Sequence, residues 1–123
     1  RAAERSLQSF FEAHGLSGDQ PHVIGAGASM YFQGLRPVLK DIDVFVPGLA
    51  EPHVQEVHEG FEVDAHNDMD DLAEGFSQRV LADRVHRGKL QLMSLPHVLE
   101  MKRYLDRPKD QPDIALLEER LGK

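Results

Sequence analysis

The sequence predicts a single small α/β or α+β domain. Its 123 residues suit one compact core. Hydrophobic residues make up 41% of the chain and charged residues 28%, which is typical of globular domains. Segments with helical spacing alternate with short β-branched segments along the chain. We therefore treat residues 1–123 as one domain without repeats or linkers.

Apolar spacing and glycine stops define the elements expected in the first 46 residues. Leu7, Phe10 and Phe11 are spaced to share one helix face, and Gly15 is a natural helix end. A second helix is expected to end at Gly34 in the same way. The elements expected here are a helix over 2–14, a strand over 22–26, a helix over 27–34 and a strand over 41–46.

The middle of the chain gives one clear strand. Residues 61–66 alternate apolar and polar side chains with the period of two expected of a half-buried strand. Residues 49–60 are expected to form a short helix or irregular structure, and residues 67–71 a turn. The early part of residues 72–85 is expected to be helical.

Capping residues place the last two helices. Ser94 is a favourable N-cap, and Pro96 suits the first turn that follows it. Asp110 is expected to cap the final helix, which Gly122 ends. The elements expected here are a strand over 89–94, a helix from Ser94 through about Leu105 and a helix over 112–121.

Charge and composition narrow the classes of partner. The chain has 14 Lys and Arg against 21 Asp and Glu, and its formal charge of −7 argues against non-specific binding to DNA or to an anionic membrane. It has no cysteine, which excludes a disulfide framework and a cysteine-based zinc site, and we expect a cytoplasmic protein. No apolar run approaches the ~18 residues of a membrane span, and no signal-peptide pattern is present.

Two aspartates open an otherwise apolar strand in the stretch KDIDVFV. Asp41 and Asp43 are two residues apart, so on a strand their side chains share one face, with Cα atoms ~6.6 Å apart. Ile42, Val44 and Val46 then face the core. Two desolvated carboxylates repel each other unless a cation lies between them. Mg²⁺ or Mn²⁺, bound through oxygen, resolves this conflict.

Asp64 is the expected third carboxylate, on the polar face of the strand over 61–66. If this strand lies beside the strand over 41–46, three carboxylates converge as in two-metal phosphoryl-transfer sites. The alternative is that these aspartates lie at a solvated strand edge. His66 shares the face of Asp64 and is either a solvated side chain or a substrate contact. The seven histidines show no zinc-helix spacing.

The stretch VIGAGAS runs from a strand into the start of a helix. Free backbone N–H groups at such a turn form an anion site, and glycine allows a phosphate to approach closely. Gly25, Gly27 and Ser29 are therefore candidate phosphate contacts, the last through its hydroxyl. The alternative is a tight strand–helix turn in which small residues serve packing.

The order of these motifs resembles the nucleotidyltransferase superfamily, the polymerase-β-like fold. GAGASMYFQGLRPVLKDIDVFV is similar to its glycine turn, its short helix ending in Gly, an Arg, and Asp-x-Asp on a strand. SLPHVLEMKRYLDRPKDQPDIALLEERL is similar to a segment of small prokaryotic nucleotidyltransferase-like proteins, including those of the AbiEii toxin type. The resemblance covers residues 22–46 and 94–121 and implies a nucleotidyltransferase-like mixed sheet flanked by helices.

The resemblance also implies a role for each candidate residue. Asp41, Asp43 and Asp64 would form the Mg²⁺ or Mn²⁺ site, and Asp64 would aid deprotonation of the acceptor hydroxyl. Arg36 and Lys102 would neutralise phosphate charge on an NTP substrate. The residues expected to lie against the triphosphate are Gly25, Gly27 and Ser29. The residues expected to cap and orient the last helix are Asp110 and Asp113.

The leading hypothesis for function is Mg²⁺-dependent transfer of a nucleoside monophosphate from an NTP to an acceptor hydroxyl on protein, RNA or a small molecule. The alternative is a catalytically inactive binding module of this fold, related to a toxin–antitoxin system or a mobile element. Its support is the small size, Ala26 where the family often has Gly or Ser, and Leu39 near a position often held by Ser or Thr. A nuclease or phosphatase using the same acids is a third hypothesis.

Overall fold

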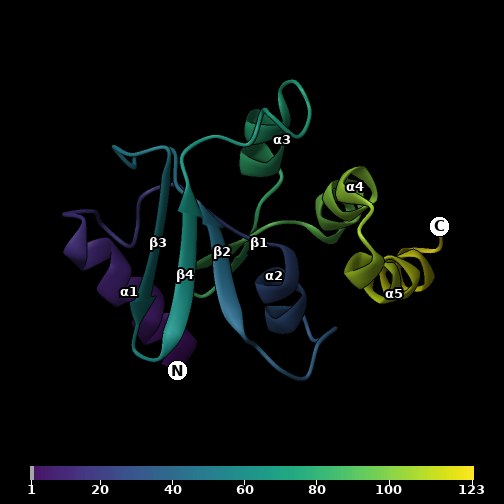
Figure 1. The fold of residues 1–123 in the computed structure, drawn as a ribbon, viewed down its shortest axis with the longest axis horizontal. Coiled ribbons are helices and arrows are strands. Elements are labelled where there is room, and N and C mark those ends of the chain that lie inside the picture. The colour runs from purple at the N-terminus through teal and green to yellow at the C-terminus, as the bar shows by residue number, and fades with distance from the viewer. Residues whose placement is uncertain (1) are drawn as a thin grey trace.

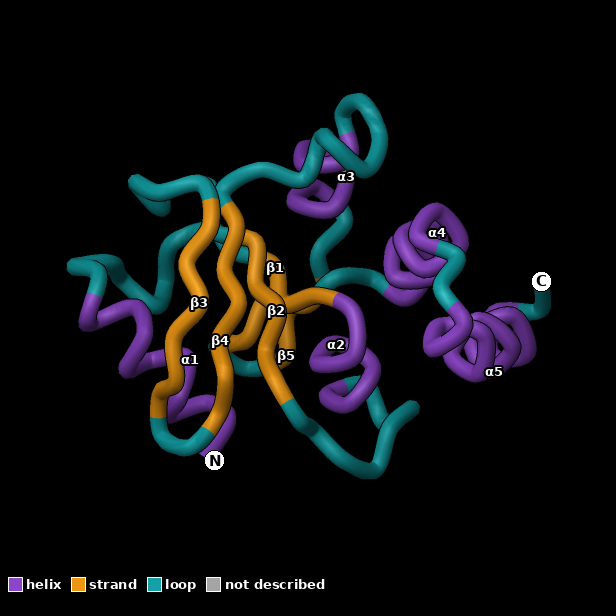
Figure 2. The backbone as a smooth tube through the Cα atoms, in the orientation of Figure 1, coloured by secondary structure: helices purple, strands orange, loops and turns teal. Residues whose placement is uncertain are grey.

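A six-stranded mixed sheet organises the fold, and helices pack on both of its faces (Figures 1 and 2). The structure is a computed structural model that describes residues 2–123, and it is a small single-domain α+β fold. None of the helices within residues 2–123 is long and apolar enough to cross a bilayer. The helices are α1 (Ala2–Ala13), α2 (Ala26–Phe32), α3 (Phe76–Ala82), α4 (Leu95–Leu105), the 3₁₀ turn η1 (Pro108–Asp110) and α5 (Gln111–Leu121). The strands are β1 (Val23–Gly25), β2 (Asp41–Phe45), β3 (His53–His58), β4 (Phe61–His66), β5 (Val85–Arg87) and β6 (Leu90–Leu92).

The strand order places the sequence candidates near the centre of the sheet. The strands lie in the order β3-β4-β2-β1-β6-β5. Within this order, β2 runs parallel to β4 and antiparallel to β1, and β3 and β4 form an antiparallel hairpin. The β2–β4 register aligns Asp43 with Asp64, and the β1–β2 register aligns Gly25 with Asp43. Gly25, Asp43 and Asp64, which span 39 positions of the sequence, therefore lie in one row across three neighbouring strands.

The two faces of the sheet bury different apolar sets. On one face α1 packs against β3 and β4, with Leu7, Phe10 and Phe11 buried as their spacing predicts. Ile42 and Val44 of β2 face the same cluster. The second cluster takes its sheet members from β1, from the end of β2 and from the residue after β6, so it leaves this face of β3 and β4 uncovered. Its buried members are Val23, Met30, Phe45, Phe76, Val80, Met93, Val98, Leu99, Ile114 and Leu117.

Two strands that the sequence does not reveal, β3 and β5, form the edges of the sheet. The expectation of a short helix or irregular structure over 49–60 is wrong, because His53–His58 is a strand. An edge strand has one neighbour and few buried positions, and only Val54 of β3 is buried. Polar residues therefore occupy both of its faces, and the alternation that identifies a strand is lost. The strand β5 is not evident from the sequence for the same reason, because it also has one neighbouring strand and none of its residues is buried.

The other expected elements are confirmed, with ends that agree within two residues, except that the helix expected in the early part of residues 72–85 begins only at Phe76, after a turn over 72–75. Ser94 occupies the N-cap position of α4, and Pro96 lies in its first turn. Asp110 occupies the N-cap position of α5, but its side chain makes no capping hydrogen bond to that helix. It accepts hydrogen bonds from Arg107 and Lys102 instead. The expectation that Asp110 orients the last helix therefore holds through ion pairs, not through a cap.

Candidate functional site

Three aspartates line one face of the sheet. Asp43 of β2 and Asp64 of β4 are aligned partners on neighbouring parallel strands, and Asp41 precedes Asp43 by two residues. All three side chains therefore point to the same side. Ile42 and its partner Val63 are buried on the opposite side. Asp41 is exposed, while Asp43 and Asp64 are half-buried, so a ligand can reach the three carboxylates from solvent.

Burial and like charge raise the pKa of Asp43 from 3.8 to about 6. Burial is the largest cause of this rise, and the charges of Asp41 and Asp64 add to it. The positive charges of Lys102 and Arg107 oppose it without cancelling it. An added cation stabilises a carboxylate in such surroundings and reverses a rise of this kind. The three carboxylates thus form an electronegative site that favours a cation.

Two histidines extend this polar face on the side away from β2. His53 of β3 and His66 of β4 are aligned partners in the β3–β4 hairpin, and their rings stack with centroids 4.4 Å apart and planes at 8°. Asp64 accepts a hydrogen bond from Nε2 of His53 through Oδ1. Nε2 of His66 lies 3.5 Å from the same oxygen. Asp64 is therefore shared between the aspartate row and the histidine pair.

The glycine turn adjoins the aspartates, but its serine is used internally. Gly25 is aligned with Asp43 and precedes the first residue of α2. A Cβ atom on Gly27 would lie 2.6 Å from Nη1 of Arg36, so glycine makes room for the Arg36 guanidinium. Ser29 is fully buried, and its hydroxyl donates to the Met93 carbonyl at 2.6 Å. Ser29 thus anchors α2 to the end of β6 and does not face the aspartates as a free donor.

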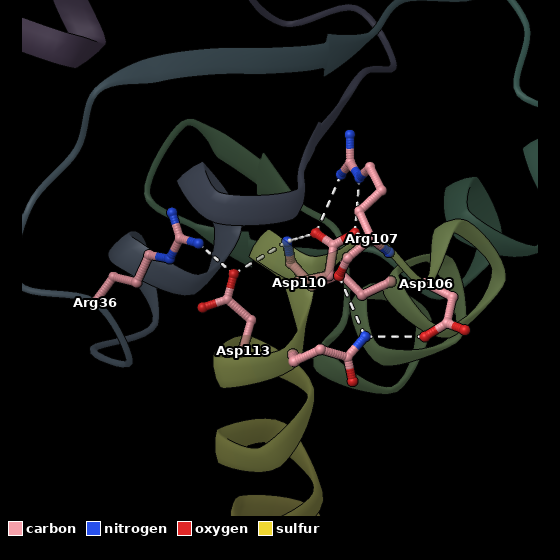
Figure 3. A network of polar contacts seen from close by, with 7 residues as sticks. Arg36, Asp106, Arg107, Asp110 and Asp113 are labelled. Atoms are coloured by element: carbon pink, nitrogen blue, oxygen red, sulfur yellow. Dashed lines mark hydrogen bonds and ion pairs between the residues drawn. The ribbon is translucent and has the colours of Figure 1, made fainter.

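A network of ion pairs joins the two C-terminal helices to the rest of the domain (Figure 3). Nζ of Lys102, which is 5% exposed, lies 3.1 Å from Oδ1 of Asp110 and 3.1 Å from Oδ2 of Asp113. Arg36, in the loop after α2, pairs with Asp113. Arg107 donates to Asp110 through Nε at 2.7 Å and through Nη2 at 3.1 Å. These contacts fix α5 against α4 and against the glycine turn.

The two cations that pair with Asp110 differ in how far they are exposed to solvent. Arg107 pairs with Asp110 and keeps a side chain that is 43% exposed. The charges of Arg107 and Lys102 both lower the pKa of Asp43, so both cations lie within electrostatic reach of the aspartate row. Lys102, the cation expected from the sequence, is the more deeply buried of the two. Arg107 is therefore the more accessible cation near Asp43.

The structure brings some of the sequence candidates together and keeps others apart. Asp41, Asp43 and Asp64 share one face, and Gly25 lies next to them. Ser29 is held in the interior. The site residues that the sequence analysis did not identify are His53, His66 as a partner of Asp64, and Arg107. The spacing Asp-x-His on a strand predicts that His66 lies on the same face as Asp64. No sequence pattern predicts the position of His53, because it depends on the strand β3.

The fold and the site define an α+β domain whose open sheet face carries a row of acidic and histidine side chains beside a cationic helical network. The chain matches no protein-family model, and neither the curated proteins nor the solved structures include a significant match. The chemistry of the site must therefore be argued from its own residues.

Proposed function

We infer that the protein is a Mg²⁺-dependent nucleotidyltransferase that moves a nucleoside monophosphate from an NTP to an acceptor hydroxyl. The observation that carries this proposal is the alignment of Asp43 with Asp64 on parallel neighbouring strands, with Asp41 on the same face. The acceptor belongs to a protein, an RNA or a small molecule. The resemblance of residues 22–46 and 94–121 to the nucleotidyltransferase superfamily supports the proposal independently of this geometry.

The donor set fits a hard divalent cation. Carboxylate oxygens are the ligands that Mg²⁺ and Mn²⁺ prefer, and one or two of them commonly hold Mg²⁺ together with substrate phosphates. Asp41, Asp43 and Asp64 offer such oxygens from one sheet face. Burial and the two acidic neighbours raise the pKa of Asp43 although Lys102 and Arg107 oppose this rise, so the aspartate row can accommodate further positive charge. Asp41 and Asp43 would hold the ion with Asp64 as the third carboxylate.

The reaction we propose is an in-line displacement at the α-phosphorus of the NTP. The acceptor oxygen forms the new P–O bond, the bond to pyrophosphate breaks, and the hydroxyl proton passes to a carboxylate, a role that we assign to Asp64. A bound divalent ion would neutralise negative charge on the attacking and leaving oxygens. Arg107, the more exposed of the two cations whose charge acts on Asp43, and Arg36, which lies against Gly27, are the groups that we assign to phosphate oxygens.

Nucleotide binding to Asp41→Asn/Asp43→Asn tests the proposal. We expect the unmodified protein to bind at least one of ATP, CTP, GTP and UTP in the presence of Mg²⁺ or Mn²⁺, and to transfer label from an α-³²P NTP to an acceptor. The double variant should lose transfer and weaken metal-dependent binding by at least about 100-fold, since two ligands of the ion are gone. Isothermal titration calorimetry and the labelling assay measure these two effects.

A matched control separates the site from overall charge. Asp19→Asn/Glu51→Gln also removes two negative charges, but from exposed loop positions, and should leave nucleotide binding unchanged. If the unmodified protein binds none of the four nucleotides, and the aspartate variant behaves like this control, the proposed activity is wrong. Release of free nucleotide in place of its attachment to an acceptor would instead identify a nuclease or phosphatase.

One observation favours the second candidate function, an inactive binding module. Lys102 and Arg36, which the resemblance assigns to phosphate, are already neutralised by Asp110 and Asp113. The Ser29 hydroxyl is likewise engaged with the main chain. A protein that binds NTP with Mg²⁺ but transfers no label to any acceptor would match this alternative.

A further inference from the structure

A second group of metal-ligating side chains lies on the outer half of the same sheet face. One ligand atom each of His53, Asp64 and His66 lies within 4.8 Å of the other two. Within residues 2–123 this is the single cluster of histidine, cysteine and acidic side chains that meets this criterion. The side chains are 50%, 29% and 45% exposed in that order, so solvent reaches the space between them.

The chemistry of this group differs from that of the aspartate row. Two imidazoles and one carboxylate are the donor set of open transition-metal sites, in which water or substrate fills the remaining positions. Mg²⁺ prefers oxygen donors and keeps most of its waters, so it gains little from His53 and His66. Zn²⁺ and its first-row neighbours bind imidazole well. The two halves of the face thus suit different classes of cation, with Asp64 at the boundary.

The backbone holds the three ligands in place. His53 and His66 are directly opposed in the antiparallel β3–β4 hairpin, and Asp64 precedes His66 by two residues on the same face. The hairpin closes through Glu59 and Gly60, both with positive φ (50° and 84°), which is the pattern of a tight two-residue turn that fixes the register. The stacked rings direct both Nε2 atoms toward Oδ1 of Asp64. Binding a metal here requires little rearrangement of the main chain.

A similar set of residue types on the opposite face shows what a purely structural cluster looks like. His14 and His58 both hydrogen-bond Glu56, at 3.0 and 2.8 Å, and His58 also hydrogen-bonds Ser9 through Nδ1. Both rings contact Phe10, and the two histidine side chains are only 19% and 14% exposed. This cluster docks α1 onto β3. His53 and His66 dock no helix and face solvent.

We propose that His53, Asp64 and His66 form a binding site for a first-row divalent transition-metal ion, with Zn²⁺ as its simplest probe. Two Nε2 atoms and one carboxylate oxygen ligate the ion, and its open positions face solvent. The site stands on its own geometry and does not depend on nucleotidyl transfer, although both sites use Asp64. A metal held here lies beside the aspartate row and is placed to act on whatever ligand that row binds.

Zn²⁺ titration of the metal-free full chain tests the proposal. We expect binding of one Zn²⁺ per chain by calorimetry, in a buffer that does not chelate the ion, with Mg²⁺ failing to compete. His53→Gln/His66→Gln should weaken Zn²⁺ binding by at least about 100-fold. Loss of one outer-shell partner lowers metal affinity by up to about 100-fold, and this variant removes two direct ligands. His86→Gln removes an exposed histidine from the edge strand β5 and should leave Zn²⁺ affinity unchanged.

The outcomes also separate this site from the proposed enzyme activity. His53→Gln/His66→Gln should retain Mg²⁺-dependent nucleotide binding, whereas Asp41→Asn/Asp43→Asn should retain Zn²⁺ binding. Zn²⁺ bound equally by the histidine variant and the unmodified protein would overturn the proposal. A crystal of the unmodified protein soaked in Zn²⁺ guards against misfolding of the variant: an anomalous peak ~2.0–2.1 Å from both Nε2 atoms supports the site, and a peak elsewhere or no peak overturns it.

Discussion

Replacing Lys102 by Met is expected to lower the free energy of unfolding by about 3–5 kcal/mol, because two buried carboxylates lose the cation that they share. Nζ of Lys102 lies 3.1 Å from carboxylate oxygens of both Asp110 and Asp113. Asp110 is 1% exposed and Asp113 is 8% exposed, so water cannot replace the lost ammonium group. Arg107 and Arg36 still reach these two carboxylates, which places the expected loss toward the lower end of the range.

The same network predicts a pH dependence. Hydrogen bonds from Arg107, and then a hydrogen bond and the charge of Lys102, hold the pKa of Asp110 well below its usual range. A carboxyl group with a lowered folded-state pKa contributes stability above its unfolded pKa, and this contribution is lost as the pH falls below about 3.9. Lys102→Met should therefore be most destabilising near neutral pH, and the difference from the unmodified protein should shrink in acid.

Urea unfolding followed by circular dichroism measures both effects. Arg103→Met is the matched control, because it removes a cation from the same helix that pairs with Glu118 at 2.7 Å but is 47% exposed. An exposed pair of this kind contributes less than about 1 kcal/mol. If Lys102→Met is no more destabilising than Arg103→Met, then Lys102 is not a structural cation and its assignment to the network is wrong.

Replacing Asp43 by Asn should have the opposite effect and stabilise the metal-free protein at pH 7.5 by about 1–3 kcal/mol. Burial first, and then the charges of Asp41 and Asp64, raise the pKa of Asp43 from 3.8 to about 6. The folded protein binds this proton more tightly than the unfolded chain does. Stability from Asp43 is therefore fully present below pH about 3.8 and is lost as the pH rises through about 6. The upper limit follows from about 1.4 kcal/mol per pKa unit, and solvent screening of a half-buried group reduces it.

Unfolding curves at pH 3.5 and pH 7.5 in EDTA test this prediction. The two proteins should have similar stability at pH 3.5, and Asp43→Asn should be the more stable at pH 7.5. Asp19→Asn, at an exposed loop position, should show no such divergence. Adding Mg²⁺ should narrow the gap at pH 7.5, since a bound cation stabilises the ionised Asp43. An Asp43→Asn protein that is less stable than the parent at pH 7.5 would show that Asp43 is held by attractive contacts.

Asp43 and Asp110 show why residue type alone does not determine the role of an aspartate. Both lie within reach of Lys102 and Arg107. Asp110 hydrogen-bonds both cations directly, and their attraction exceeds the cost of burial. Within residues 2–123, Asp43 forms no hydrogen bond or ion pair with either cation and lies next to two other acids, so burial and repulsion dominate. The first arrangement stabilises the fold, and the second is typical of a site that binds a cation.

The local pattern of the sequence was enough to predict the parts of the site that lie within one element. Alternation along 41–46 and 61–66 indicated which side chains leave the core, and it placed Asp41, Asp43 and Asp64 on polar faces. These predictions depend only on the fixed period of a strand. Helices with a clear apolar stripe or a capping residue, such as those over 2–14 and 94–105, were predicted for the same local reason.

Edge strands and ion pairs lay beyond that local pattern. β3 has one hydrogen-bonded neighbour and one buried side chain, so nothing in residues 53–58 distinguishes it from a loop. Without β3, His53 had no predicted partner, and the histidine pair was missed. The family resemblance implies that Lys102 neutralises phosphate charge, but the sequence does not predict its ion pairs with Asp110 and Asp113, because a helix position does not reveal which acid from a later helix will pack beside it.

The sequence by itself determined which residues turn outward from each central strand, because side-chain direction follows from backbone geometry over two or three residues. Tertiary structure alone decided which of them meet. The parallel register of β2 with β4 places Asp43 beside Asp64, and the register of the β3–β4 hairpin places His53 beside His66. The packing of α5 against α4 pairs Lys102 with Asp110 and Asp113. Each of these pairings is selected by burial of the whole apolar core, which no short stretch of sequence contains.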